Sequence, residues 1–201
     1  MNLFKTILLG CILMSFISCD KSNTVRVEDH DKDIMMKELH KMIDEMMTTP
    51  MPGDPDHHFA KMMQLHHKGA ISMANIVLLD GKDTAIRRMA HMMAQKQTQE
   101  IADLQAFLNS HIPHAVNQEF NMKMEMSMEK MNRNADLQII NGNIDHDFAI
   151  LLIFHHQSAI EMADLVLHYG HEESIGHMAE MMKEDQEMEI EELQKWLLGI
   201  R

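Results

Sequence analysis

The stretch DHHFAKMMQLHHKGAISMANIVLLDG, residues 56–81, decides the fold because it recurs as DHDFAILLIFHHQSAIEMADLVLHYG, residues 145–170. A shift of 89 residues aligns the two without a gap. The match continues to Leu108 and Leu197, and about 24 of the 53 positions from Asp56 to Leu108 are identical to their partners. Similarity at a fixed period indicates that one structural unit has been duplicated.

Each copy has the pattern of two helices joined by a short break. Pro55 suits the first turn of a helix, and Gly81 and Gly170 stand where helices commonly stop. Asp83 and Glu172 then begin a second helix, whose apolar residues recur at helical spacing. We therefore expect an all-α fold, a ferritin-like four-helix bundle built from two duplicated helical hairpins.

A shorter, methionine-rich helix is expected before each hairpin, over residues 34–47 and 122–135. The second contains NMKMEMSMEKM, residues 121–131, with Met at every second position from 122 to 128. Such alternation is typical of a half-buried strand, but alignment with residues 35–42 favours a helix. The expected domains are a first helical repeat at 34–111 and a second at 117–199.

The N-terminus resembles a bacterial lipoprotein signal peptide, residues 1–18. Lys5 supplies a positive start, the run ILLGCILMSFIS is apolar, and FISC ends at Cys19. The resemblance implies cleavage before Cys19, lipidation of its sulfur, and a flexible tether over 19–33. An ordinary cleaved signal and an uncleaved anchor are the alternatives. We expect a protein of the bacterial cell envelope, periplasmic or surface-exposed, that contacts the membrane only through its lipidated N-terminus.

Composition limits the possible partners. The net charge is −13, which would repel nucleic acid and attract cations. Removal of the signal peptide leaves only Cys19, so no thiolate site is expected. The chain has 24 methionines and 15 histidines, and any soft metal must therefore be bound by thioether and imidazole groups.

Methionine and histidine recur at matching helical positions in both copies. His66 and His67 correspond to His155 and His156, and a group of three methionines follows on the next helix of each copy. The candidate metal ligands are Met62, Met63, His66, His67, Met73, Met89, Met92, Met93, His155, His156, Met162, Met178, Met181 and Met182. Weaker accessory candidates are Met122, Met124, Met126 and Met128.

Thioether and imidazole together suit Cu(I), and Ag(I) by extension. The competing interpretation is that methionine fills irregular gaps in a helical core, as an unbranched side chain often does. A di-iron bundle enzyme would need paired Glu-x-x-His motifs, and the sequence contains none. We therefore expect no enzyme activity.

The run D-x-x-F-A-x-M-M-x-x-H-H-x-G-A-I-x-M-A, residues 56–74, resembles the hallmark of the CopM-like copper metallochaperones. Their shared domain is catalogued as domain of unknown function 305, here in two tandem copies over roughly residues 35–198. The resemblance implies an envelope protein with a ferritin-like bundle that binds copper, and sometimes silver, through His66, His67, Met73, His155, His156 and Met162. The second copy departs from the motif, because Leu151 and Leu152 replace the Met pair and Ser158 replaces Gly.

The expected function is that of an envelope copper-binding lipoprotein that scavenges, buffers or hands on Cu(I) in copper homeostasis or resistance. Its expected partners are copper ions and another envelope copper protein. The alternative is a structural or protein-interaction helical bundle of the cell envelope with a Met-rich core. The sequence does not indicate an oligomeric state.

Overall fold

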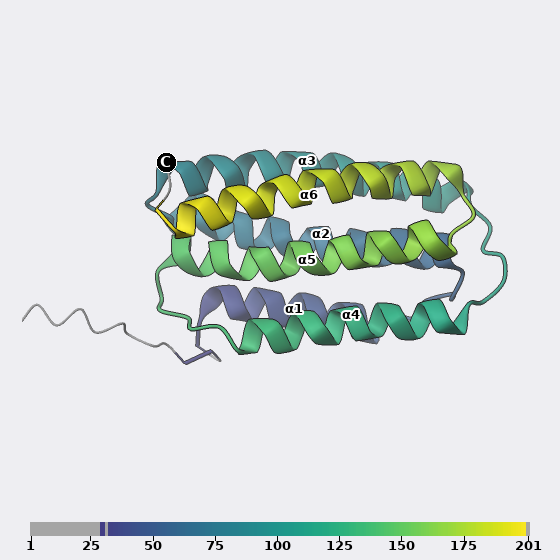
Figure 1. Cartoon of the computed structure of the whole chain (residues 1–201), viewed down its shortest axis with the longest axis horizontal. Coiled ribbons are helices and arrows are strands. Elements are labelled where there is room, and N and C mark those ends of the chain that lie inside the picture. The colour runs from purple at the N-terminus through teal and green to yellow at the C-terminus, as the bar shows by residue number, and fades with distance from the viewer. Residues whose placement is uncertain (1–28, 31, 200–201) are drawn as a thin grey trace, which may run out of the picture.

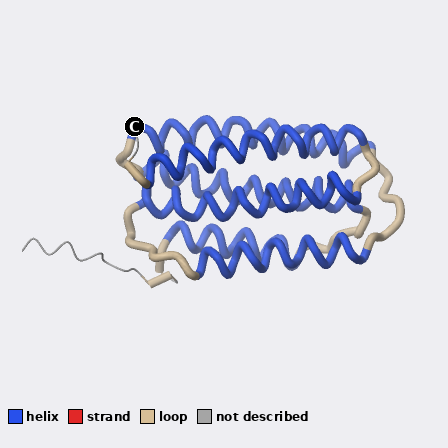
Figure 2. Tube along the Cα trace, viewed as in Figure 1, coloured by secondary structure: helices blue, strands red, loops and turns tan. Residues whose placement is uncertain are grey.

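The computed structural model describes residues 29–30 and 32–199, and all regular secondary structure in this part is α-helix (Figure 2). The predicted signal peptide, Cys19 and most of the tether lie outside the described residues. The all-α prediction is confirmed. The six helices are α1 Ile34–Thr48, α2 Pro55–Asp80, α3 Thr84–Ser110, α4 Gln118–Asp136, α5 Ile144–Tyr169 and α6 Glu173–Leu197.

The helices form three stacked pairs, in which α2 and α5 lie between the pair α1–α4 and the pair α3–α6 (Figure 1). Helix α2 packs against α1, α3 and α5, and helix α5 packs against α2, α4 and α6. The two middle helices therefore form the centre of the core. The short helices α1 and α4 add a whole layer below the two long hairpins, α2–α3 and α5–α6.

Short polar side chains begin five of the six helices. Asp33, Asp54, Asp83, Asn117 and Asn143 each accept hydrogen bonds from N–H groups of the first turn, which satisfies donors that the helix itself cannot pair. Helix α6 differs, because Glu172 at its N-cap position makes no such side-chain bond. The carboxylate of Glu172 is thus available for other contacts.

Two buried aspartates, 89 residues apart, connect the halves of the chain. Asp145 at the start of α5 accepts from the backbone N–H groups of Lys82 and Asp83, at 2.8 and 2.9 Å. Asp56 at the start of α2 accepts from those of His171 and Glu172, at 2.9 and 3.2 Å. Each half therefore holds the loop that precedes the second long helix of the other half.

Helix α5 is long and apolar enough, by length and composition, to cross a membrane. In this fold it is a core helix: Phe148, Leu151, Leu152 and Val166 are buried against its neighbours. Its apolar sequence is explained by burial on several sides, as expected for the central helix of a bundle.

Candidate metal sites

Four buried histidines meet where α2 crosses α5. The rings of His66 and His155 stack with centroids 3.6 Å apart, and His67 and His156 continue the row at 6.3 and 5.7 Å from their neighbours. All four side chains are fully buried. The structure thus brings together the four histidines that the repeat singled out.

Protein groups already contact one nitrogen of each central ring. His155 donates from Nε2 to the carbonyl oxygen of His66 at 3.0 Å, and Nε2 of His66 lies 3.0 Å from the Ser158 hydroxyl. At the ends of the row, Nε2 of His67 lies 2.9 Å from Glu100 and Nε2 of His156 lies 2.7 Å from Glu189. Those two end contacts are close but lack hydrogen-bond direction, because both Nε2 atoms have no well-directed partner.

Burial keeps the central pair neutral. Loss of hydration lowers the pKa of His66 and of His155 well below the usual value, and the neighbouring imidazoles lower it further. The Nδ1 atoms of all four histidines are buried without a hydrogen-bond partner. They are metal-binding atoms in character, but no three ligand atoms of this row lie within 4.8 Å of one another.

The predicted methionine ligands divide by exposure. Most are buried in the core: Met62, Met63, Met73, Met93, Met124, Met128, Met162 and Met182. Met89 and Met178 are half-buried. Met92, Met122, Met126 and Met181 are exposed. On α4 the alternation by two thus separates into a buried row and an exposed row, as helical geometry requires.

Five methionines and one histidine line a pocket of about 180 Å³ at the end of the molecule where α1 ends and α2 begins. The pocket is completed by Thr49, Asn121 and Glu125, and its sulfur-bearing residues are Met46, Met47, Met51, Met62 and Met128. Helices α1, α2 and α4 and the loop after α1 all contribute. Two of the predicted candidates, Met62 and Met128, converge here.

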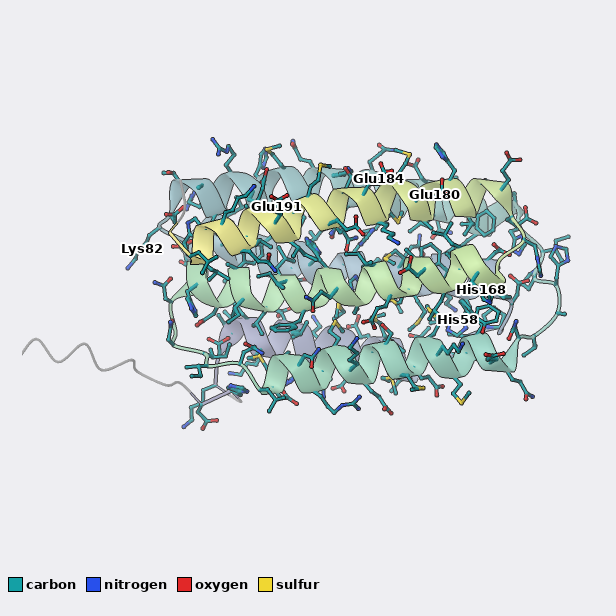
Figure 3. All side chains as sticks on the ribbon, viewed as in Figure 1. His58, Lys82, His168, Glu180, Glu184 and Glu191 are labelled. Carbon is teal, nitrogen blue, oxygen red and sulfur yellow. The ribbon has the colours of Figure 1, made fainter. Side chains whose placement is uncertain are left out.

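His58 supplies the imidazole group of this pocket. It lies at the same end of the bundle as His168 (Figure 3). Its Nδ1 donates to the side-chain oxygen of Asn121 at 2.8 Å. Burial lowers the pKa of His58, although the bond to Asn121 opposes this effect. A neutral ring that donates from Nδ1 keeps its lone pair on Nε2, which is the form that binds a metal.

The sequence interpretation missed four of the six Met and His residues that line this pocket. These four residues are not repeated, because the positions 89 residues later hold other residue types. Met46, Met47, Met51 and His58 correspond to Ala135, Asp136, Ile140 and Asp147. The density of methionine from 46 to 51, beside the PMPGDP linker, was the signal that could have found them.

A second methionine-lined hollow, of about 610 Å³, runs between α3 and α6. Met89, Met92 and Met188 line it beside charged residues that include Lys96 and Asp185, which form an ion pair. Met178 and Met181, the repeat partners of Met89 and Met92, do not line it. No histidine faces this hollow, so its chemistry is weaker for metal than that of the pocket around His58.

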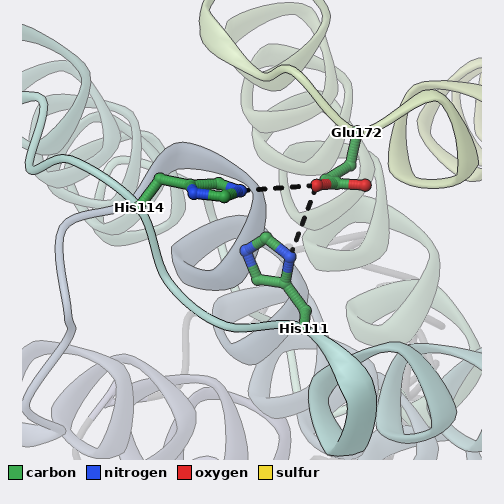
Figure 4. Close-up of side chains that lie close together, drawn as sticks. All are labelled: His111, His114 and Glu172. Atoms are coloured by element: carbon green, nitrogen blue, oxygen red, sulfur yellow. Dashed lines mark ion pairs between the residues drawn. The ribbon is translucent and has the colours of Figure 1, made fainter.

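One further group lies at the end of the bundle that carries His58. The ligand atoms of His111, His114 and Glu172 lie within 4.8 Å of one another, and no other three His, Cys, Asp or Glu residues do so within residues 29–30 and 32–199 (Figure 4). Oε1 of Glu172 lies 3.6 Å from Nδ1 of His111 and 3.6 Å from Nε2 of His114. None of these three residues was among the ligands predicted from the sequence.

Comparison with known proteins identifies the family of the domain. The family described as Domain of unknown function (DUF305) matches residues 56–197, which span both copies of the repeat in a single match. No curated protein matches the chain.

Two solved structures have a similar fold. A DUF305 fragment from Deinococcus radiodurans is 21% identical, with a TM-score of 0.54 over 73% of this chain and 96% of that one. A DUF305 protein from Streptomyces coelicolor, described as secreted, is 22% identical, with a TM-score of 0.58 over 75% of this chain and 94% of that one. At these identities the likeness concerns the fold.

Proposed function

Because this chain belongs to the DUF305 family, whose description assigns no activity, we propose a function from the site itself: binding of Cu(I) in the bacterial cell envelope. The observation that carries the proposal is the pocket lined by five methionines and His58. Ag(I) shares the ligand preferences of Cu(I) and is the alternative ion.

The chemistry of the pocket suits a soft ion. Thioether sulfur is uncharged and releases no proton on binding, and imidazole nitrogen adds a stronger donor. Glu125 lines the same pocket and supplies a negative charge near the ligands. Methionine is also flexible, so an ion can be exchanged between thioethers with little movement of the backbone. These properties favour a protein that scavenges, buffers or hands on copper.

Other features of the chain are consistent with this function. The residues around His66 resemble the CopM-like copper metallochaperones, and a relative is described as secreted. We extend the proposal to a lipid anchor at Cys19, to delivery of copper to another envelope protein, and to the absence of catalysis. Contacts made by residues 89 apart support descent from two tandem copies, with α2, α3, α5 and α6 as a ferritin-like four-helix bundle.

Competition titration with Cu(I) tests the proposal directly. The untagged protein is titrated anaerobically with Cu(I) against a chromophoric chelator, and Met62→Leu/Met128→Leu is compared with wild type. Each Met→Leu change conserves volume and costs less than about 1.5 kcal/mol of stability. Loss of a supporting contact costs a metal site about 10–100-fold in affinity. We expect the loss of two ligands to lower the affinity for Cu(I) by at least as much.

Two further variants identify the site. Met36→Leu/Met131→Leu removes two buried thioethers that do not line the pocket, and it should bind Cu(I) as wild type does. His66→Gln/Met73→Leu disturbs the central row instead. If that variant loses Cu(I) while the pocket variant keeps it, the central histidines are the site. If all variants bind equally or none binds, the alternative of a structural or interaction bundle is favoured.

A further inference from the structure

We propose that His111, His114 and Glu172 form a second metal site, one for a divalent ion such as Zn²⁺ or Cu²⁺, at the end of the bundle. This site is separate from the pocket around His58 and does not depend on Cu(I) binding there. Two imidazoles and one carboxylate are the ligand set of borderline divalent ions, whereas Cu(I) prefers thioether.

The spacing of the three ligand atoms fits such an ion. Zinc bonds of about 2.0–2.2 Å at near-tetrahedral angles place neighbouring ligand atoms roughly 3.3–3.6 Å apart. Two of the three distances here are 3.6 Å, and the third is no longer than 4.8 Å. The His114 side chain is exposed, so its ring is free to turn toward an ion. Three protein ligands leave a fourth position for water.

His111 is held in the orientation that a ligand needs. Its Nε2 donates to Oδ1 of Asp54 at 3.2 Å, so its other nitrogen, Nδ1, faces Glu172 (Figure 4). The ring also stacks on Phe107, with centroids 4.6 Å apart. A buried carboxylate that accepts from the outer nitrogen of a metal-binding histidine is the usual support of such sites.

Asp54 also fixes the backbone around the group. Its Oδ1 caps α2 by accepting from His57 N–H, and its Oδ2 accepts from His114 N–H at 3.0 Å. Asp54 is only 1% exposed, so these bonds form in a water-poor setting. The loop after α3 and the start of α2 are thereby locked together, which places both histidines before any ion binds.

Glu172 has no competing structural role for its side chain. It is the one N-cap residue among α1–α6 that makes no side-chain cap bond. Its Oε1 instead lies 3.6 Å from Nδ1 of His111 and 3.6 Å from Nε2 of His114. A cation can be bound between these three groups, and the net charge of −13 favours its arrival.

The test is titration of the untagged full chain with Zn²⁺ and, separately, with Cu²⁺ in air, after treatment with a chelator. We expect one equivalent of each ion to bind tightly to wild type and to raise the midpoint of thermal unfolding. Loss of a residue that only supports a ligand costs about 10–100-fold in metal affinity. His114→Ala and Glu172→Gln each remove a ligand, so each should lower the affinity by more than this. Both side chains are partly exposed, at 61% and 38%, so both variants should fold.

The matched controls remove an imidazole or a carboxylate from residues next to the proposed site. His171→Ala and Glu173→Gln change exposed residues beside the site and should bind as wild type does. The electron paramagnetic resonance spectrum of bound Cu²⁺ should show coupling to two nitrogens in wild type and to one in His114→Ala. Binding confined to Zn²⁺ or to Cu²⁺ identifies the ion. Absence of binding at micromolar concentrations, or equal binding by His114→Ala and Glu172→Gln, would show that the group is only an ion-pair network.

Discussion

The imidazole of His66 lies against that of His155, the residue that matches it in the second copy, with ring centroids 3.6 Å apart. Their partners differ. His155 donates to the backbone of His66, whereas His66 contacts the hydroxyl of Ser158. Ser158 replaces Gly69 of the first copy, and a Cβ atom at Gly69 would collide with Met42 of α1. The departure of the second copy from the motif therefore provides a partner for the buried histidine of the first.

Acidification should destabilise the protein through this pair. The pKa of His66 and of His155 is lowered in the folded state, because burial disfavours the charged ring. Stability is therefore fully present above the unfolded pKa of 6.5 and is lost as pH falls below it, since the unfolded chain binds protons that the folded chain does not. The free energy of unfolding should fall by up to about 1.4 kcal/mol per pH unit for each histidine.

Denaturant unfolding between neutral pH and the lower end of the folded range measures this slope. His66→Gln/His155→Gln should be less stable at neutral pH but lose less stability on acidification. An unchanged slope in that variant would mean that other groups cause the acid sensitivity.

Alanine at Gly81 should destabilise the loop between α2 and α3. A Cβ there would lie 2.5 Å from the Val77 carbonyl oxygen and 2.6 Å from Oδ1 of Asp145. Forcing an atom into such a space typically costs about 1–3 kcal/mol. Gly176→Ala is the control, because its nearest contact is Leu167 at 3.9 Å, and it should gain about 0.5–1 kcal/mol from helix propensity. Chemical denaturation of both variants checks the opposite signs.

Loss of the Asn121 side chain should weaken Cu(I) binding without removing a ligand. Asn121 accepts from Nδ1 of His58, which leaves Nε2 as the nitrogen with a free lone pair. Loss of an outer-shell partner of this kind costs about 10–100-fold in metal affinity. Competition titration of Asn121→Ala should show this loss, while Asn132→Ala on the same helix should bind normally. Equal affinity in the two variants would show that the hydrogen bond from His58 to Asn121 does not support the site.

The exposed methionines of α4 should affect the rate of copper capture rather than its equilibrium. Met122 and Met126 are 55% and 58% exposed, and Met126 is not a lining residue of the His58 pocket. Met122→Ser/Met126→Ser should leave the fold and the affinity unchanged but slow the uptake of Cu(I). Stopped-flow transfer from a Cu(I) chelator measures the rate. An unchanged rate would leave these residues with no role in metal capture.

The helices were predictable because their signals are local. Pro55 and Asp56 lie in the first turn of α2, and Gly81 follows its last residue, as the sequence predicted. The repeat also brought His66 and His155 to attention, and the structure places them in contact. Sequence could not show that their Nε2 atoms are taken by protein groups, because those partners lie on another helix.

The pocket around His58 was less predictable for a geometric reason. Met51, Met62 and Met128 come from a loop and two helices, and only the packing of α1 and α4 under α2 brings them together. His111 and His114 lie in a segment without periodicity, where no pattern indicates what faces them. Periodic patterns show which residues share a helix face, but not which distant loops meet at its end.

Asp56 and Asp145, which each bind a loop of the other half, affect the order in which the chain can complete its fold. The start of α3 is held by Asp145, and the start of α6 is held by Asp56. During synthesis the first hairpin, α2–α3, therefore emerges before Asp145, and its loop gains this partner only after α4 and the start of α5 have been made. A protein cut between residues 111 and 117 would leave each fragment with a buried carboxylate and no N–H groups to receive it. Because each half of the chain supplies a carboxylate that the other half needs, we expect the two halves to unfold together.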